Sequence, residues 1–229
     1  MHYPGLALYA EGPTDYRFLS PVLRRLCEHL CLTGANSPVD VSDVLGLDHP
    51  KAFDGAPRKV RIVEAGRDAA GAWRVLFVHA DGAGDARAAR DQQVLPGLGL
   101  LSTELSDKEA GVGVVPVRET EAWALVDGDA LRSAFGTALD DAEMNLPKSA
   151  ADTESDKNPK KTLEEAFLAT RPTGRRARRG ASPLLGQIGE NVRLERLRAL
   201  DSFQAFENDL VDALRELDIL RKGFGGRAR

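Results

Sequence analysis

Three short apolar runs, each followed within a few positions by acidic residues, constrain the fold of this chain more than any other feature. The runs are LALY at residues 6–9, VLFV at 75–78 and VVPV at 114–117. Their length and composition are typical of buried strands, and helical patterns lie between them. Strands that alternate with helices favour a mostly parallel sheet with helices on its faces. We therefore predict an α/β fold.

The acidic residues that follow these runs predict a metal site. Glu11 and Asp15 follow the first run, Asp81 and Asp85 the second, and Glu121 the third. Parallel strands bring their carboxyl ends to one edge of a sheet, so these side chains are expected to meet there. Clustered carboxylates repel one another unless a cation neutralises them. We predict Mg²⁺ or Mn²⁺ bound by Glu11, Asp81, Asp85 and Glu121, with Asp15 orienting the site. Asp127 is either a further ligand or a solvated helix end.

Charge and cysteine content limit where the protein works and what it binds. The formal charge of −4 over 229 residues gives no global attraction to nucleic acid, so any such binding needs local basic patches. No apolar run approaches the ~18 residues of a membrane span, and no signal peptide is recognisable. Cys27 and Cys31 are expected to be reduced core thiols, which fits a reducing compartment. We predict a cytoplasmic protein without membrane contact.

The periodicity of the chain divides it into two parts. Residues 1–138 alternate between strand and helix patterns and form the predicted α/β domain. Residues 139–229 are predicted to form a helical extension packed on the same domain, with a basic loop at 171–180. The predicted strands are 6–9, 59–63 (an edge strand), 73–78 and 111–117; the predicted helices begin near Thr14 and cover 86–94, 119–125, 129–135, 162–169, 188–200 and 203–217; residues 33–57 are predicted to be loop. Pro21 is expected to mark a restart or kink, and Ser202 an N-cap.

The turn after the first strand carries a resemblance to a known fold. Glu11-Gly12-Pro13-Thr14-Asp15 resembles the opening motif of the Toprim fold, which occurs in topoisomerases, DnaG-type primases and the overcoming-lysogenization-defect nucleases. In Toprim domains a later D-x-D pair binds a divalent metal. The matching positions here read His79-Ala80-Asp81, so histidine replaces the first aspartate. Histidine suits Mn²⁺ or Zn²⁺ better than Mg²⁺, which favours oxygen ligands.

A second motif narrows the resemblance. Pro116, Glu121, Ala122 and Trp123 fit the P-x-x-x-x-E-A-W pattern of small Toprim-like proteins that resemble the RloB and AbiL-type (DUF4276-like) components of bacterial phage-defence and restriction loci. The resemblance continues at residues 158–161 and 202–203. Trp123 itself is expected to pack in the core rather than to stack on a base.

Two basic features offer contacts to phosphate. Lys160 and Lys161 stand at the start of a predicted helix, where free backbone N–H groups also favour anions. Four arginines follow within five residues: Arg175, Arg176, Arg178 and Arg179. These six residues form the predicted nucleic-acid surface, although a merely solvated loop explains the arginines equally well.

Together these features predict a divalent-metal-dependent nucleic-acid phosphodiesterase, a Toprim-type endonuclease in a phage-defence or restriction context. Glu11, Asp81, Asp85, Glu121 and Lys160 are its predicted catalytic residues. The alternative is a non-catalytic Toprim-like binding subunit of a defence complex, which the histidine at position 79 favours. The chain has no Walker A loop, so any ATP hydrolysis would come from a separate partner. The sequence does not choose between DNA and RNA.

Overall fold

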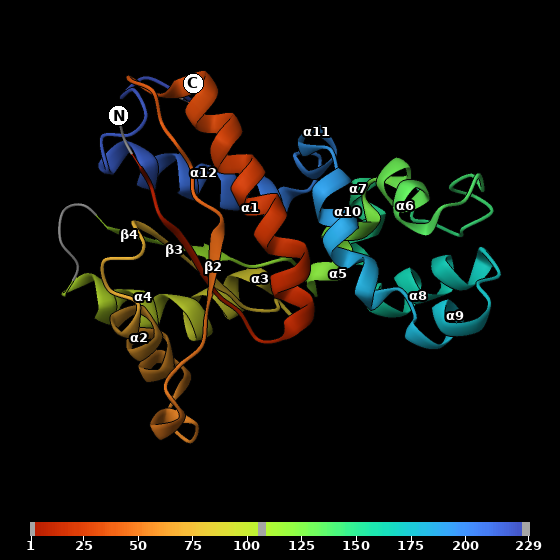
Figure 1. The fold of residues 1–229 in the computed structure, drawn as a ribbon, viewed down its shortest axis with the longest axis horizontal. Helices are drawn as coiled ribbons and strands as arrows, with labels where there is room; N and C mark the ends of the chain where they lie inside the picture. The colour runs from red at the N-terminus through yellow and green to blue at the C-terminus, as the bar shows by residue number, and fades with distance from the viewer. Residues whose placement is uncertain (1–2, 105–108, 226–229) are drawn as a thin grey trace.

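A four-stranded, all-parallel sheet organises the protein. The computed structural model describes residues 3–104 and 109–225. The strands are β1 (Leu6–Tyr9), β2 (Val44–Leu47), β3 (Val75–His79) and β4 (Ala110–Val114), in the spatial order β2-β1-β3-β4 (Figure 1). The predicted α/β class, with a parallel sheet, flanking helices and C-terminal helices, is confirmed.

The order of the strands fixes where a site is expected. From β1 the chain moves outward to β2, and it then crosses to the other side of β1 to form β3 and β4. The direction of winding therefore reverses between β1 and β3. In open parallel sheets, ligands bind outside the carboxyl ends of the strands at such a reversal.

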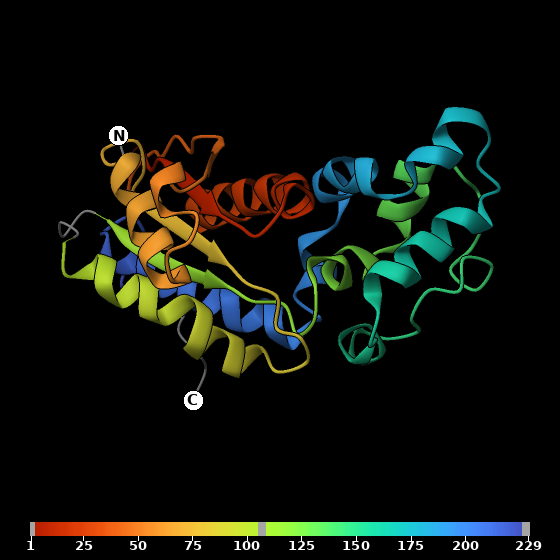
Figure 2. The ribbon, with the colours of Figure 1, turned by 90° about the horizontal axis from the view of Figure 1, so that it is seen from below.

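Helices cover both faces of the sheet. Alternate strand residues point to opposite faces, so Leu8 and Phe77 pack with α1 (Pro13–Gly34) and α12 (Asp201–Glu216). Leu76 and Val78 pack on the other face with α2 (Arg58–Asp68) and α4 (Leu95–Ser102). Figure 1 shows the resulting three layers, with α12 above the sheet and α2 and α4 below it, and in Figure 2 α2 and α4 lie toward the viewer.

The connection from β3 to β4 is one winding helical segment. It begins with α3 (Ala86–Ala89), continues as a π-helical stretch, η2 (Arg90–Val94), and ends in α4. π-Helical segments are rare and occur frequently at functional sites.

The remaining helices extend away from the sheet before the chain returns to it (Figure 1). They are α5 (Thr120–Leu125), α6 (Gly128–Phe135), α7 (Ala150–Ser155), α8 (Pro159–Ala169), α9 (Gly174–Arg179), α10 (Leu185–Asn191) and α11 (Leu194–Leu197), with the short 3₁₀ turn η3 (Ser182–Leu184) between α9 and α10. A second 3₁₀ turn, η1 (Lys51–Phe53), lies beside the sheet, between β2 and α2. The core of the extending helices is continuous with that of the sheet, because Trp123 of α5 packs edge-on against Phe203 of α12, with ring centroids 5.0 Å apart. The predictions that Trp123 lies in the core and that Cys27 and Cys31 are buried free thiols are confirmed. Residues 226–229 of the predicted extension lie outside the described residues.

Several local predictions were wrong. Residues 59–63 begin helix α2 instead of forming an edge strand, because the alternation in KVRIV is too short to separate the two periods and Ile62, Val63 and Ala65 line one helix face. The edge strand beside β1 is instead β2, which lies inside the predicted loop. Residues 174–179 of the predicted basic loop are helical, and the helix expected over 188–200 breaks after Asn191.

Two predicted helix signals also behave differently. Pro21 lies inside α1 without ending it. Ser202 does not cap α12; its hydroxyl accepts a hydrogen bond from the Trp123 indole at 3.0 Å, while the backbone N–H groups of Asp201 and Ser202 donate to the carboxylate of Glu154. The helix start is therefore satisfied from α7 rather than from its own sequence.

Candidate metal centre

Asp15 lies in the first turn of α1, at the carboxyl ends of β1 and β3, where the direction of winding reverses. Its Oδ2 accepts a hydrogen bond from the Gly12 N–H at 3.0 Å, which satisfies one of the free N–H groups at the helix start. Its Oδ1 accepts a hydrogen bond from the Thr120 hydroxyl of α5 at 3.0 Å. The side chain is buried, so these two bonds hold it in one orientation toward the end of β3.

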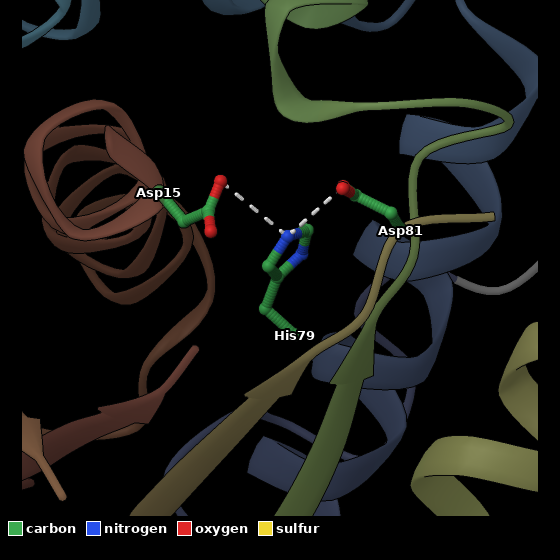
Figure 3. A group of neighbouring side chains, drawn as sticks. All are labelled: Asp15, His79 and Asp81. Carbon is green, nitrogen blue, oxygen red and sulfur yellow. Dashed lines mark ion pairs between the residues drawn. The ribbon is translucent and has the colours of Figure 1, made fainter. Parts of the chain in front are cut away.

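His79 ends β3 and is completely buried. Its Nδ1 lies 3.0 Å from the carbonyl oxygen of Val114, the last residue of β4, and donates a hydrogen bond to it. This bond turns Nε2 toward the carboxylates, 3.3 Å from Asp81 Oδ1 and 3.7 Å from Asp15 Oδ1 (Figure 3). A histidine whose second nitrogen donates to a backbone carbonyl has the arrangement usual for a metal ligand.

Asp81 follows β3 in a tight loop. A Cβ atom at Gly82 would come within 2.2 Å of the Pro116 carbonyl oxygen, so glycine is needed where this loop crosses the segment after β4. The Gly84 N–H donates to the Val117 carbonyl at 2.7 Å and fixes the loop there. These contacts turn Asp81 back toward His79, and its buried Oδ1 has no partner other than the His79 imidazole.

Asp15, His79 and Asp81 together form a group that could hold a metal ion. Each offers one ligand atom, and the three atoms lie within 4.8 Å of one another. In the part of the chain that the structure describes, it is the only group of three or more such side chains. A buried carboxylate oxygen without a donor, beside an imidazole nitrogen turned toward it, fits a divalent cation.

The charges around His79 determine its protonation. Burial lowers the pKa of the imidazole, but the carboxylates of Asp81 and Asp15 and the Val114 carbonyl outweigh it, and the net pKa is raised. Protonation of Nε2 is therefore favoured relative to a free imidazole, and the imidazolium would offset one of the two carboxylate charges. A bound metal would take the place of that proton.

A second acidic region lies beside this group on α5. Glu121 is buried, and desolvation raises its pKa; the carboxylates of Glu119 and Asp15 add to the shift, and Lys160 opposes it. The Oε2 atom of Glu119 is also buried without a hydrogen-bond partner. Glu121 does not belong to the three-residue group, but it is close enough to Asp15 and Lys160 for their charges to affect its pKa.

Two predicted ligands occupy other positions. Glu11 is half-exposed, and its carboxylate pairs with the guanidinium of Arg58 at 3.0 Å. Arg58, from α2, also donates to the backbone carbonyl of His79 and lies over the ring of Tyr9. Asp85 is exposed and caps α3 by accepting from the Ala88 N–H at 2.9 Å. The metal roles of Glu11, Asp85 and Glu121 stay predictions. Asp81 is the one predicted ligand that belongs to the three-residue group of Asp15, His79 and Asp81.

Asp127 fits neither alternative considered for it. It is buried, and its carboxylate accepts hydrogen bonds from the Arg193 guanidinium at 2.6 and 2.9 Å and from the Arg193 N–H at 3.0 Å. Burial alone would raise its pKa, but the Arg193 contacts outweigh burial and lower it. Asp127 is a structural ion pair that joins α6 to the segment before α11.

The predicted basic surface divides into two kinds of residue. Arg176 donates to the Phe135 carbonyl and lies over the Phe167 ring at 5.5 Å, so it packs against the protein. Arg175, Arg178 and Arg179 are exposed along α9. Lys160 and Lys161 are exposed in the first turn of α8, where Lys161 pairs with Glu165 at 3.3 Å.

The sequence reasoning missed Thr120 and Arg58 as parts of the site. Thr120 stands directly before Glu121, and its hydroxyl also lies 3.3 Å from His79 Nε2. A threonine at a strand-to-helix junction beside acidic residues is a usable signal. No such signal was present for Arg58, because residues 59–63 were predicted to form a strand.

Comparison with known families identifies the chain. A sequence model described as a domain of unknown function (DUF4276) matches residues 10–211. The chain belongs to this family. No curated protein and no solved structure matched it. The match begins directly after β1, ends within α12 and includes every member of the candidate metal centre. None of the helices among the described residues combines the length and apolar character needed to cross a membrane.

Proposed function

We propose that this DUF4276 protein is a divalent-metal-dependent phosphodiesterase that cleaves nucleic acid. The observation that carries the proposal is the group of Asp15, His79 and Asp81 at the carboxyl ends of β1 and β3. A bound divalent ion would lower the pKa of a coordinated water and stabilise charge on a phosphate. The Toprim relationship and the defence context rest on the sequence motifs.

The donor set favours Mn²⁺ over Mg²⁺. One imidazole nitrogen and two carboxylates face the same point, and Mg²⁺ prefers oxygen ligands and ideal octahedral geometry. Mn²⁺ accepts mixed nitrogen and oxygen ligands more readily. The Nδ1–H bond to Val114 keeps the Nε2 lone pair directed at the group when the imidazole is neutral.

The surrounding residues supply proton transfer and phosphate binding. Glu121, whose pKa burial raises, is suited to accept and release a proton. Lys160 is exposed, influences Glu121 and is suited to hold a phosphate oxygen. Glu11 is assigned a part in cleavage because it matches the glutamate of the Toprim motif, although it lies outside the three-residue metal group. The arginines of α9 would extend the contact along the backbone of a nucleic acid.

Metal titration and cleavage assays test the proposal. Isothermal titration with Mn²⁺ and Mg²⁺, followed by nicking of supercoiled DNA and cutting of single-stranded RNA, should show a Mn²⁺-preferring site and metal-dependent cleavage. Asp81→Ala should remove both. Glu11→Ala should remove cleavage while metal still binds. The matched control is Asp68→Ala, an exposed aspartate at the end of α2. Full cleavage by Asp81→Ala would sink the assignment.

One observation favours the non-catalytic alternative. The raised pKa of His79 means that a proton can satisfy the two carboxylates without metal. A binding subunit would then retain the group as a buried ion-pair cluster. This alternative predicts no heat of Mn²⁺ binding, no cleavage, and nucleic-acid binding that is unchanged by a chelator.

A further inference from the structure

The outer edge of β4 is open in the described part of the sheet. β4 is the last strand in the order β2-β1-β3-β4. The Ala110 N–H donates to Arg74, and the Val114 carbonyl accepts from Ala80, so these residues face β3. Because backbone groups alternate along a strand, those of Gly111, Gly113 and Val115 face outward. Such an edge is a template for another strand.

Two cavities lie along this edge. The first, about 660 Å³, is lined in part by Gly111, and the second, about 470 Å³, in part by Gly113 and Val115. These are the residues whose backbone groups point away from β3. Helix α12 forms one wall, and η2 with α4 forms the other; Figure 1 shows α12 and α4 on opposite sides of β4. The cavities therefore make one groove with an unpaired strand edge at its base.

An ion pair crosses the middle of the groove. Arg90 Nη1 lies 2.7 Å from Asp209 Oδ2 of α12, and both residues line both cavities. Arg90 is the first residue of the π-helical stretch, and its buried Nε has no hydrogen-bond partner. The ion pair therefore depends on an arginine that is not fully hydrogen-bonded and that lies on an irregular helix. An incoming strand could displace it.

The two cavities differ in character. Asp209, Asp212 and Glu216 of α12 line the first, which makes its helical wall acidic. Asp212 also pairs along the helix with Arg215 at 2.7 Å, an exposed contact of little strength. Leu95, Val115 and Phe206 line the second, which is more apolar.

We propose that this groove binds an extended basic segment of a partner protein, which adds to β4 as a further strand. Its backbone would pair with Gly111, Gly113 and Val115, its lysine or arginine side chains would face the acidic wall of α12, and an apolar side chain would enter the second cavity. The same acidic wall repels nucleic acid. The proposal concerns another face of the molecule and does not depend on the metal centre.

A defined peptide tests the charge preference. The probe is a fluorescein-labelled seven-residue peptide that alternates lysine with valine or threonine, and its control has glutamate at each lysine position. Fluorescence anisotropy should show binding of the basic peptide only. The double variant Asp212→Lys, Glu216→Lys should weaken binding about tenfold, with a loss that shrinks in high salt. Asp68→Lys, on the exposed end of α2, should leave binding unchanged.

Amide exchange tests the backbone pairing. Strand addition should slow hydrogen exchange at Gly111, Gly113 and Val115 and leave Val112 unaffected. Arg90→Met, which removes the bridge, should tighten peptide binding. Equal binding of the basic and acidic peptides overturns the proposal, as does protection elsewhere. Self-association of the protein through this edge, seen by sedimentation and abolished by Asp212→Lys, would assign the groove to a second copy and would also overturn it.

Discussion

Two buried acidic sites in this protein are neutralised in different ways. At Asp127 the partner is Arg193, whose guanidinium donates to both carboxylate oxygens and keeps its charge throughout the pH range of the folded protein. At Asp15 and Asp81 the partner is the imidazole of His79, which is charged only when protonated. The first site is closed by a permanent cation. The second depends on an imidazole whose pKa is raised, and a metal ion can take the place of its proton; this difference separates a structural carboxylate from a candidate ligand.

The largest expected effect is on metal binding. Asp81→Asn removes a carboxylate whose Oδ1 has no other partner, so Mn²⁺ affinity should fall by roughly a hundredfold. Asp127→Asn should leave Mn²⁺ affinity unchanged, because that carboxylate is already bonded to arginine. Isothermal titration of both variants measures the contrast. Equal losses in the two variants would remove the distinction between the sites.

The reverse contrast is expected in stability. Asp127→Asn breaks the pairing with Arg193 and should lower the free energy of unfolding by about 2 kcal/mol, below the usual cost of breaking a buried pair because Arg193 is half-exposed. Asp81→Asn should cost the metal-free protein less, since its side chain is 37% exposed and makes one ion contact. Urea unfolding without metal gives both values.

Replacing His79, the partner of Asp15 and Asp81, should alter the metal preference of the site. His79→Asp replaces the imidazole nitrogen with oxygen, so the ratio of Mg²⁺ to Mn²⁺ affinity should rise by about tenfold. The metal-free variant should also lose stability, because three carboxylates would then face one another without the imidazolium. Competitive titration of the two ions tests the ratio. An unchanged ratio would mean that His79 is not a ligand.

The pH dependence of stability should follow the permanent pair. The pKa of Asp127 is lower in the folded protein than in the unfolded chain, where it is about 3.9. Its stabilising contribution is therefore present above about pH 4 and is lost as pH falls through the lower folded value. The stability difference between the wild type and Asp127→Asn should shrink below pH 4. A constant difference down to pH 2 would contradict the role of the ion pair.

The smallest effect is expected at Glu11. Its carboxylate pairs with Arg58 outside the metal group, so Glu11→Gln should change Mn²⁺ affinity by less than about threefold. The measurement is the same titration. A loss as large as that of Asp81→Asn would return Glu11 to the ligand set that the sequence predicted.

The position of the site at the carboxyl edge of the sheet could be predicted from the sequence, whereas most of the residues that form the site could not. The runs that became β1, β3 and β4 were recognisable because they are short, apolar and followed by turns, and parallel strands then require a shared carboxyl edge. Side-chain direction could not be predicted in the same way. In the EGPTD turn the helix starts at Pro13, so Asp15, rather than Glu11, turns toward β3.

Other features of the structure depend on contacts that the sequence pattern did not show. Arg58 neutralises Glu11 from α2, which was taken for a strand because its apolar pattern is too short to show the helical period. Asp85 serves the start of α3, a local use that competes with any metal role. The sequence singled out His79 by its resemblance to the Toprim pattern, but the orientation of the side chain depends on a backbone atom of another strand.

That backbone atom is the carbonyl of Val114, and it has an evolutionary consequence. Any side chain at position 114 presents the same carbonyl oxygen, so substitutions there leave the tautomer and aim of His79 intact as long as β3 and β4 keep their register. His79 is therefore expected to lose this orientation when β3 and β4 change register, rather than when residue 114 is substituted. A contact made by the backbone of a neighbouring strand is in this way sheltered from point mutation.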